Sequence, residues 1–420
     1  MKCMEKYRDR ISTNVFWQPT MPKHWHVLKL RYVLQKLQRP KSPDAELLVC
    51  SNSGKVTVKG DNKLGLVAED DKIYQGVAKD DLLIHGMDTW HGAIAISNYD
   101  GMCTPVVHVC NSNQNKAFVA YYLRNMANGK VFKLISNGVR QNTSDFRCWD
   151  KLAVVPIVLP PLEEQKTIVS YLDTKCSRIE TLLANKEKEI SLLQEMKQRI
   201  IADAVTRGLN PNVKFKSTNI PWLPEIPEQW EIKPIRSLLR EATEKSETGE
   251  EELLSLSQYT GISYKKEAKN VGMFEAESTV GYKKVKAGQF VMNIMLAWNG
   301  SYAVSNLDGI ISPAYCVFDF ISDCDKMYYH YLLRLGIYSG AFKTASRGII
   351  DSRLRLYPNR FYPFPIICPP IEEQHAIVSY ITERTAKIDS LVEKLNKEIE
   401  CIKEYKQRLI SDVVTGQIKV

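Results

Sequence analysis

The same helix-forming segment occurs twice in this sequence, and the duplication restricts the folds open to the chain. "PPLEEQ" at residues 160–165 and "PPIEEQ" at residues 369–374 lie 209 positions apart. From these prolines onward the two copies align without a gap to Thr206 and Thr415, and 22 of the 47 positions are identical. Because unrelated sequences agree at about one position in twenty, the chain contains a true internal repeat.

The repeat extends well beyond this segment. "WHGAIAISNYDGMCTP" at 90–105 aligns with "WNGSYAVSNLDGIISP" at 298–313, and further matches lie near residues 12–25 and 217–230. Solenoid repeats are about 20 to 50 residues long, so a unit of this size predicts a duplicated domain and not a solenoid.

Each copy begins with short segments of mixed pattern. Runs at 47–54, 81–86, 92–97 and 105–110 are β-prone and bounded by turn residues, whereas 116–126 and 326–336 have helical spacing. Asp100-Gly101 and Asp308-Gly309 each lie between two β-prone runs, where we expect glycine to supply the positive φ of a tight hairpin. The pattern predicts an α+β fold with two mixed α/β globular domains.

A heptad pattern follows each proline pair. Apolar residues step by three and four along both segments, which predicts two coiled-coil helices of about 65 Å each. A pseudo-twofold repeat would pair them antiparallel within one chain. The predicted seam contains Leu172, Ile179, Leu183, Ile190, Leu193, Ile200, Ile381, Ile388, Val392, Leu395, Ile399, Ile402 and Leu409.

The prolines and glutamates suit a helix start. Proline is tolerated in the first turn, and the following glutamates complement the helix dipole. Neighbouring carboxylates on a helix do not face each other, so these pairs are not interpreted as a catalytic dyad. The expected domain limits are 1–159 and 209–368 for the globular domains, with 160–208 and 369–420 for the helices.

Composition and missing motifs limit the chemistry. The net charge of +9 and the pI near 8.9 favour an anionic partner. Ten scattered cysteines without a C-x-x-C pair, a charged N-terminus and the lack of a long apolar run predict a cytoplasmic protein with mostly buried thiols and no metal site. We find no P-loop, no G-x-G-x-x-G and no H-E-x-x-H, and we predict no catalytic residues and no bound cofactor.

The two helix segments resemble those of a known family. "PPLEEQ" with "IVSYLD", "PPIEEQ" with "IVSYIT", the endings "RIIADAVTRG" and "RLISDVVTGQ", and "WLPEIPEQWEIKPI" at 222–235 are similar to the specificity subunit of Type I restriction-modification enzymes. "WQPTMPKHWHVLKL" at 17–30 departs from the pattern but keeps its Trp and Pro spacing.

The resemblance covers nearly the whole chain and implies a non-catalytic subunit. Each globular domain would then be a target recognition domain for one half of a bipartite, asymmetric DNA site. The helices would set the spacing of the two halves and dock two modification (methyltransferase) subunits. S-adenosylmethionine, ATP and Mg would bind partner subunits, among them the restriction (translocase-nuclease) subunits.

Polar residues at strand ends are the candidates for DNA contact. Such side chains can bond base edges or phosphates, although ordinary solvated loops have the same composition. The candidates are Ser51, Asn52, Lys55, Arg140, Gln141, Ser257, Gln258, Tyr259, Arg347 and Arg353.

Two other functions stay open at this point. A coiled-coil adaptor that binds proteins would share the repeat and the heptads, but it would show no affinity for duplex DNA. A methyltransferase would need a cofactor loop and an N-P-P-Y or P-C motif, and neither is found.

Overall fold

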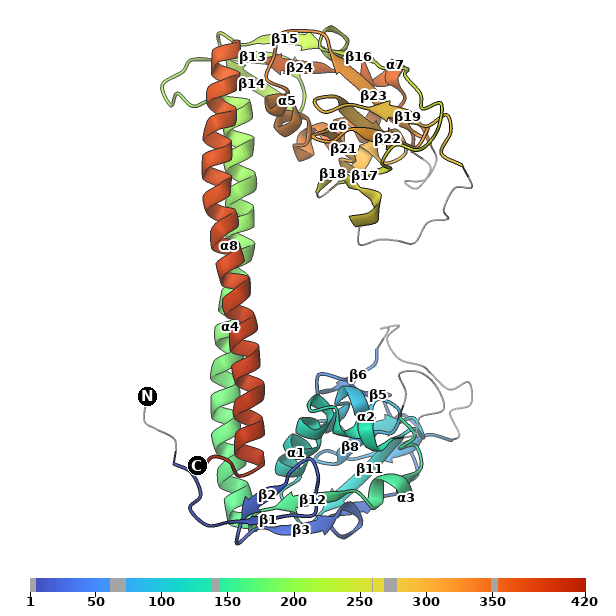
Figure 1. Cartoon of the computed structure of the whole chain (residues 1–420), viewed down its shortest axis with the longest axis vertical. Helices are drawn as coiled ribbons and strands as arrows, with labels where there is room; N and C mark the ends of the chain where they lie inside the picture. Colours follow the sequence, from blue (N-terminus) through green and yellow to red (C-terminus); the bar gives the residue numbers. More distant parts are fainter. Residues whose placement is uncertain (1–4, 61–72, 137–143, 259, 268–277, 349–353) are drawn as a thin grey trace. The chain divides into compact units, whose positions relative to one another are not determined.

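A computed structural model describes residues 5–60, 73–136, 144–258, 260–267, 278–348 and 354–420. The chain divides into two compact units. Unit 1 comprises Met1–Glu187 and Asn396–Val420, and unit 2 comprises Lys188–Leu395. Each unit contains one globular domain and a part of both long helices, α4 (Leu162–Arg207) and α8 (Ile371–Val414) (Figure 1).

The globular domain of unit 1 is built from short strands and a few helices. In chain order these are β1 (Arg10–Ser12), β2 (Thr20–Pro22), β3 (His26–Lys29), η1 (Leu30–Tyr32), β4 (Leu34–Lys36), β5 (Leu48–Cys50), β6 (Val56–Val58), β7 (Gln75–Val77), β8 (Leu82–His85), η3 (Thr89–His91), β9 (Ile94–Ile96), β10 (Gly101–Cys103), β11 (Val107–Ser112), α1 (Lys116–Asn128), α2 (Val131–Ile135), α3 (Trp149–Ala153) and β12 (Pro156–Leu159).

The globular domain of unit 2 repeats this order with small changes. Its elements are β13 (Phe215–Ile220), β14 (Leu223–Pro227), β15 (Glu231–Pro234), η4 (Ile235–Ser237), β16 (Leu239–Glu241), β17 (Leu254–Ser257), β18 (Gly261–Tyr264), η5 (Lys265–Glu267), β19 (Lys283–Val285), β20 (Phe290–Asn293), η6 (Ala297–Asn299), β21 (Tyr302–Val304), β22 (Gly309–Ile311), β23 (Tyr315–Phe320), α5 (Lys326–Leu333), α6 (Gly336–Ala345), α7 (Pro358–Phe361) and β24 (Pro365–Cys368).

Both globular domains are organised around a four-stranded antiparallel sheet. Its order is β4-β11-β8-β9 in unit 1 and β16-β23-β20-β21 in unit 2, so equivalent strands occupy equivalent places. Two-stranded pairs complete each domain, including the hairpins β5-β6 and β17-β18. The predicted α+β fold with two mixed domains and two long paired helices is confirmed.

The alternation of side chains along the strands divides each domain into two cores. In β8, Leu82 and Ile84 belong to the core that the sheet shares with α1 and the long helices, whereas Leu83 packs with the hairpin β5-β6 on the other face. In β20, Phe290 and Met292 face the helices in the same way.

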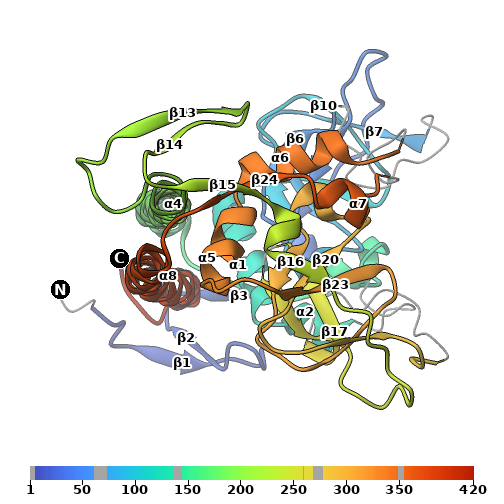
Figure 2. The same cartoon turned by 90° about the horizontal axis from the view of Figure 1, so that it is seen from above.

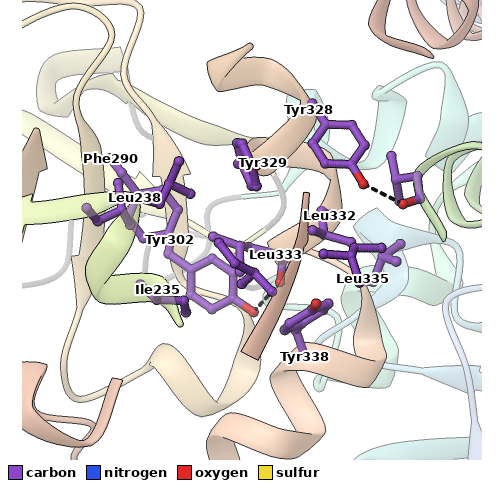
Figure 3. Packing of buried hydrophobic residues seen from close by; sticks show 14 of the residues in the cluster. Ile235, Leu238, Phe290, Tyr302, Tyr328, Tyr329, Leu332, Leu333, Leu335 and Tyr338 are labelled. Carbon is purple, nitrogen blue, oxygen red and sulfur yellow. Dashed lines mark hydrogen bonds between the residues drawn. The ribbon is translucent and has the colours of Figure 1, made fainter. Parts of the chain in front are cut away.

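The core of unit 2 that faces the long helices is rich in tyrosine, and Figure 3 shows the hydrogen bonds of two of these residues, Tyr328 and Tyr302. Tyr328 of α5 donates from its hydroxyl to the carbonyl of Val205 in α4 at 2.8 Å. Tyr302 of β21 donates to the carbonyl of Leu333 at 2.9 Å. Figure 2 shows α5 between the long helices and the sheet, and the Tyr328 hydrogen bond fastens the domain to α4.

The long helices pack antiparallel in each unit. In unit 1, Lys406 Nζ lies 2.7 Å from Glu180 Oε1, and in unit 2 Lys197 Nζ lies 2.7 Å from Asp389 Oδ1. From the first pair to the second, the residue number rises in α4 and falls in α8, so the two helices run in opposite directions. Within the predicted seam, Leu172, Ile381, Ile388, Leu395, Ile399 and Leu409 are buried, and Ile179, Leu183, Ile190, Leu193, Ile200, Val392 and Ile402 are partly buried.

The glutamine of the first proline-glutamate-glutamine motif joins two helix starts in unit 1. Gln165 is buried; its Nε2 donates to the carbonyl of Pro160 at 2.8 Å, and its Oε1 accepts from the backbone N–H of Asn115 at 3.0 Å. Asn115 is in turn the N-cap of α1. Beside it, Glu164 Oε1 accepts from the indole of Trp25 at 3.2 Å.

The second motif makes the same contacts in unit 2. Gln374 Nε2 donates to the carbonyl of Pro369 at 2.8 Å, and its Oε1 accepts from the backbone N–H of Asp325, the N-cap of α5, at 2.9 Å. Glu373 Oε2 accepts from the indole of Trp230 at 2.8 Å. The second glutamate of each pair therefore accepts a hydrogen bond from a tryptophan indole, and it also places an acidic side chain in the first turn of the long helix.

The predicted Asp-Gly hairpins are wrong. Gly101 and Gly309 do not have positive φ; they begin β10 and β22, which pair with β7 and β19. Glycine is needed there for a different reason: a Cβ at Gly101 would lie 2.6 Å from the carbonyl oxygen of Glu46. The aspartates accept backbone N–H groups instead, as Asp100 does from Lys79 at 2.9 Å.

In the described part of the chain, no helix carries an apolar stretch sufficient for crossing a bilayer.

Candidate nucleic-acid interface

The hairpin β5-β6 presents the first group of candidate DNA contacts at its tip. Its strands pair Leu48 with Val58 and Cys50 with Val56, and their apolar residues pack on one face of the sheet; residues 51–55 form the tip. The tip is closed by the backbone N–H of Ser51 donating to the carbonyl of Lys55 at 2.9 Å.

The candidates at this tip differ in whether their side chains are free of structural contacts within the turn and exposed for binding DNA. The Ser51 hydroxyl donates to the carbonyl of Lys55 at 2.9 Å, which gives it a structural role in the turn. Asn52 and Lys55 are exposed. A hydrogen bond from Lys406 is the largest cause that lowers the pKa of the Glu180 carboxyl in α4. The charges of Lys55 and Arg124, which lie near this carboxyl, lower its pKa further.

The hairpin β17-β18 is the counterpart in unit 2. Ser257 pairs with Gly261 at its end, and the Ser257 hydroxyl accepts from the backbone N–H of Thr260 at 3.4 Å. Gln258 is partly buried, and its carbonyl accepts from Arg334 Nη2 at 2.5 Å. Tyr259 lies outside the described residues.

Arg347 belongs to a separate basic surface in unit 2. It is exposed, and its backbone pairs with that of Arg355 at 2.9 and 3.0 Å. Together with Tyr357, Pro358, Asn359 and Arg360 it lines an open hollow of about 380 Å³. Two guanidinium groups beside an exposed tyrosine ring can bind phosphate and stack on a base. Arg140, Gln141 and Arg353 lie outside the described residues.

Sequence reasoning missed several basic residues near these candidates. Arg360 joins the hollow with Arg347, Lys343 lies over the ring of Trp298 at 5.2 Å from its centre, and Arg124 and Arg334 bind the two hairpin tips. Arg124 and Arg334 could have been identified from the sequence, because they occupy the same position in the two copies of the repeated helix.

Among the described residues, histidine, cysteine and acidic side chains do not gather into a metal site, and several thiols are buried. No group of three His, Cys, Asp or Glu side chains is placed to hold a metal ion in that part of the chain. Burial raises the pKa of Cys50, Cys103, Cys110 and Cys316 to about 12, so these thiols are poor nucleophiles. Burial also lowers the pKa of His330 to about 4.

Sequence comparison places the chain beside one group of proteins. A family model described as the Type I restriction modification DNA specificity domain matches residues 22–192. The predicted type I restriction enzyme MjaX specificity subunit of Methanocaldococcus jannaschii is 26% identical over 450 aligned positions, which cover 95% of each chain. The EcoDI specificity subunit of Escherichia coli is 20% identical and covers 69% of this chain and 68% of its own.

Solved structures show the same fold. A chain from a study of complex assembly and conformational transition of the type I R-M system superposes with a TM-score of 0.68 at 15% identity, covering 95% of this chain and 99% of that one. The HsdS subunit from Thermoanaerobacter tengcongensis superposes with a TM-score of 0.50 at 15% identity, covering 95% of this chain and 98% of its own.

Proposed function

Because this chain belongs to the specificity (HsdS) subunits of Type I restriction-modification systems, we propose that each of its units reads one half of a split, asymmetric DNA site. The subunit is the non-catalytic, DNA-specificity part of such an enzyme.

One observation carries this proposal: the two units repeat one topology but present different residues at equivalent hairpin tips. Residues 51–55 read "SNSGK", whereas residues 257–261 read "SQYTG". Equal scaffolds with unequal tips suit two half-sites of different sequence. Two identical copies of a single unit would instead favour a palindrome.

The paired long helices support a fixed separation of the half-sites. Their heptads and the ionic contacts of the seam favour one register in each unit, and α4 alone, with 46 residues, has a length of about 69 Å. We propose that this coiled coil sets the number of unread base pairs between the halves.

Partners would supply the chemistry. We propose that two modification subunits dock on the helices and provide S-adenosylmethionine-dependent methylation, and that restriction subunits add ATP- and Mg-dependent translocation and cleavage. The complex would work in the cytoplasm, where the chromosome is. The predicted domain limits at 159, 208 and 368 are part of the same proposal.

Methylome sequencing tests the function directly. Cells that express the modification subunits with this chain should carry one split methylated motif, and cells with the modification subunits alone should not. Duplex DNA that is neither bound nor methylated by the assembled complex would favour a protein-binding adaptor instead.

A further inference from the structure

Two arginines hold equivalent positions in the repeated helix of the two units. "KAFVAYYLR" at 116–124 aligns with "KMYYHYLLR" at 326–334, so Arg124 near the middle of α1 corresponds to Arg334, which directly follows α5. Both side chains are partly buried. Each leaves its helix toward a hairpin on the sheet of its own unit.

Arg124 binds the tip of the hairpin β5-β6. Its Nη2 donates to the carbonyl of Ser53 at 2.8 Å. The guanidinium also lies directly against Gly54, which has a φ of +73°, and a Cβ at this glycine would overlap it. The tip therefore has both a charged hydrogen bond and a glycine that leaves room for the arginine.

Arg334 binds the tip of the hairpin β17-β18. Its Nη2 donates to the carbonyl of Gln258 at 2.5 Å, and its Nη1 donates to the carbonyl of Tyr302 in β21 at 2.8 Å. One guanidinium thus links the tip to the edge strand of the central sheet. The planar group with several donors suits this double contact better than a lysine would.

We infer that Arg124 and Arg334 are positioning residues for DNA recognition, each holding the reading hairpin of one unit through main-chain carbonyl groups. This inference rests on the proposed function, in which the tips contact the DNA. Because the bonds from Arg124 to Ser53 and from Arg334 to Gln258 are made to main-chain carbonyl groups, the side chains of residues such as Asn52 and Gln258 can change without loss of these bonds.

The anchor matters because base discrimination depends on placement. A side chain that bonds a base edge must be held to within a fraction of an ångström, and a loose tip would bond wrong bases almost as well. Loss of one anchor should therefore relax one half-site and leave the other half and the spacer unchanged.

The test uses the full chain assembled with its modification subunits. Arg124→Met and Arg334→Met keep the apolar stem but remove the guanidinium. We expect each variant to lower sequence discrimination by about tenfold in one half of the methylated motif, with a different half affected in each. Gly54→Ala, which displaces the Arg124 guanidinium, should relax the same half as Arg124→Met.

Matched controls separate the anchor from general damage. Arg31→Met and Arg236→Met alter exposed arginines at equivalent places in the two units and should leave the motif intact. Hydrogen exchange should show the amides of residues 51–55 opening about tenfold faster in Arg124→Met, with the core of unit 1 unchanged.

The outcomes are distinguishable. A wild-type complex that methylates no split motif overturns the proposed function, and this inference with it. A wild-type split motif that stays equally sharp in both arginine variants overturns the inference alone. Equal relaxation of both halves by either single variant overturns it as well.

Discussion

Lys197 Nζ lies 2.7 and 2.8 Å from the two carboxylate oxygens of Asp389, although Lys197 occupies a seam position of the coiled coil. The equivalent pair, Lys406 with Glu180, has the same spacing in unit 1. A charged residue at a seam position costs stability but excludes registers in which it has no partner. We therefore interpret these pairs, together with the interhelical pair of Lys186 and Glu398, as determinants of helix register.

Replacing these lysines by leucine should strengthen the helix pairing and weaken its register. Lys197→Leu and Lys406→Leu should each raise the free energy of unfolding by about 1 kcal/mol, because an apolar residue packs better in the seam. Urea denaturation measures the change, and methylome sequencing should reveal more than one spacer length. Lys188→Leu, on the exposed face of α4, is the control. A fall in stability at both sites would contradict this interpretation.

Removing the buried glutamines should be costly. Gln165→Leu or Gln374→Leu would leave a main-chain carbonyl and an N–H group without their partners, which costs about 1 to 3 kcal/mol. Chemical denaturation of the full chain checks this, with the exposed Gln198→Leu and Gln407→Leu as controls. Equal effects at the buried and exposed positions would show that the hydrogen bonds of Gln165 and Gln374 contribute nothing to the stability of the fold.

Acid should weaken the helix pairing in unit 1 through Glu180. The hydrogen bond from Lys406 lowers the pKa of Glu180 below its ordinary value of 4.5. A depressed carboxyl pKa gives stability that is complete above the ordinary value and is lost as the pH falls through the folded value. Glu180→Gln should therefore flatten the fall in melting temperature below pH 4.5. Glu189→Gln, exposed on the same helix, should leave the slope unchanged.

Shortening the coiled coil should change the spacer of the recognised site. Deleting one heptad from each long helix, residues 185–191 and 395–401, removes segments that face each other and keeps the seam in phase. At 1.5 Å per residue the helices shorten by about 10 Å, or about three base pairs of duplex. Methylome sequencing should then show the same two half-sites closer together. Altered half-sites with an unchanged spacer would disprove the role of the helices in spacing.

DNA binding by the assembled complex should weaken steeply with salt. Lysines and arginines that neutralise phosphates release counterions, so the logarithm of the binding constant falls linearly with the logarithm of salt concentration. Replacing Arg347 and Arg360 by glutamine should reduce that slope by about one for each phosphate that is no longer neutralised. If replacing Arg347 and Arg360 leaves the salt dependence unchanged, the hollow that these arginines line does not contact DNA.

The features that periodicity encodes were predictable. The repeat and the heptads identified the two long helices and their antiparallel pairing, because a seam repeats every seven residues whatever surrounds it. The strands at 82–85 and 94–96 and the helix at 116–128 likewise follow local pattern. Residues 137–143 and 349–353, where three candidate contacts lie, are outside the described residues.

Contacts between distant segments were beyond local pattern. The partner of Gly101 is β7 and not the preceding strand, and the constraint on this glycine comes from Glu46, far away in sequence. Ser51 is polar but is used within its own turn, and Arg124 reaches a tip 71 residues away. Such roles depend on tertiary approach, which a single sequence shows only when both copies of a repeat keep the same residue.

The glutamine bridges also define where recognition modules could be exchanged between relatives. Gln165 and Gln374 bond the starts of α1 and α5 through main-chain N–H groups, so a foreign domain needs a helix N-terminus in the same place but no particular side chain at its N-cap. Grafts joined just before the proline pairs should therefore seat correctly on the resident helices, and new specificities could arise by recombination at these two junctions.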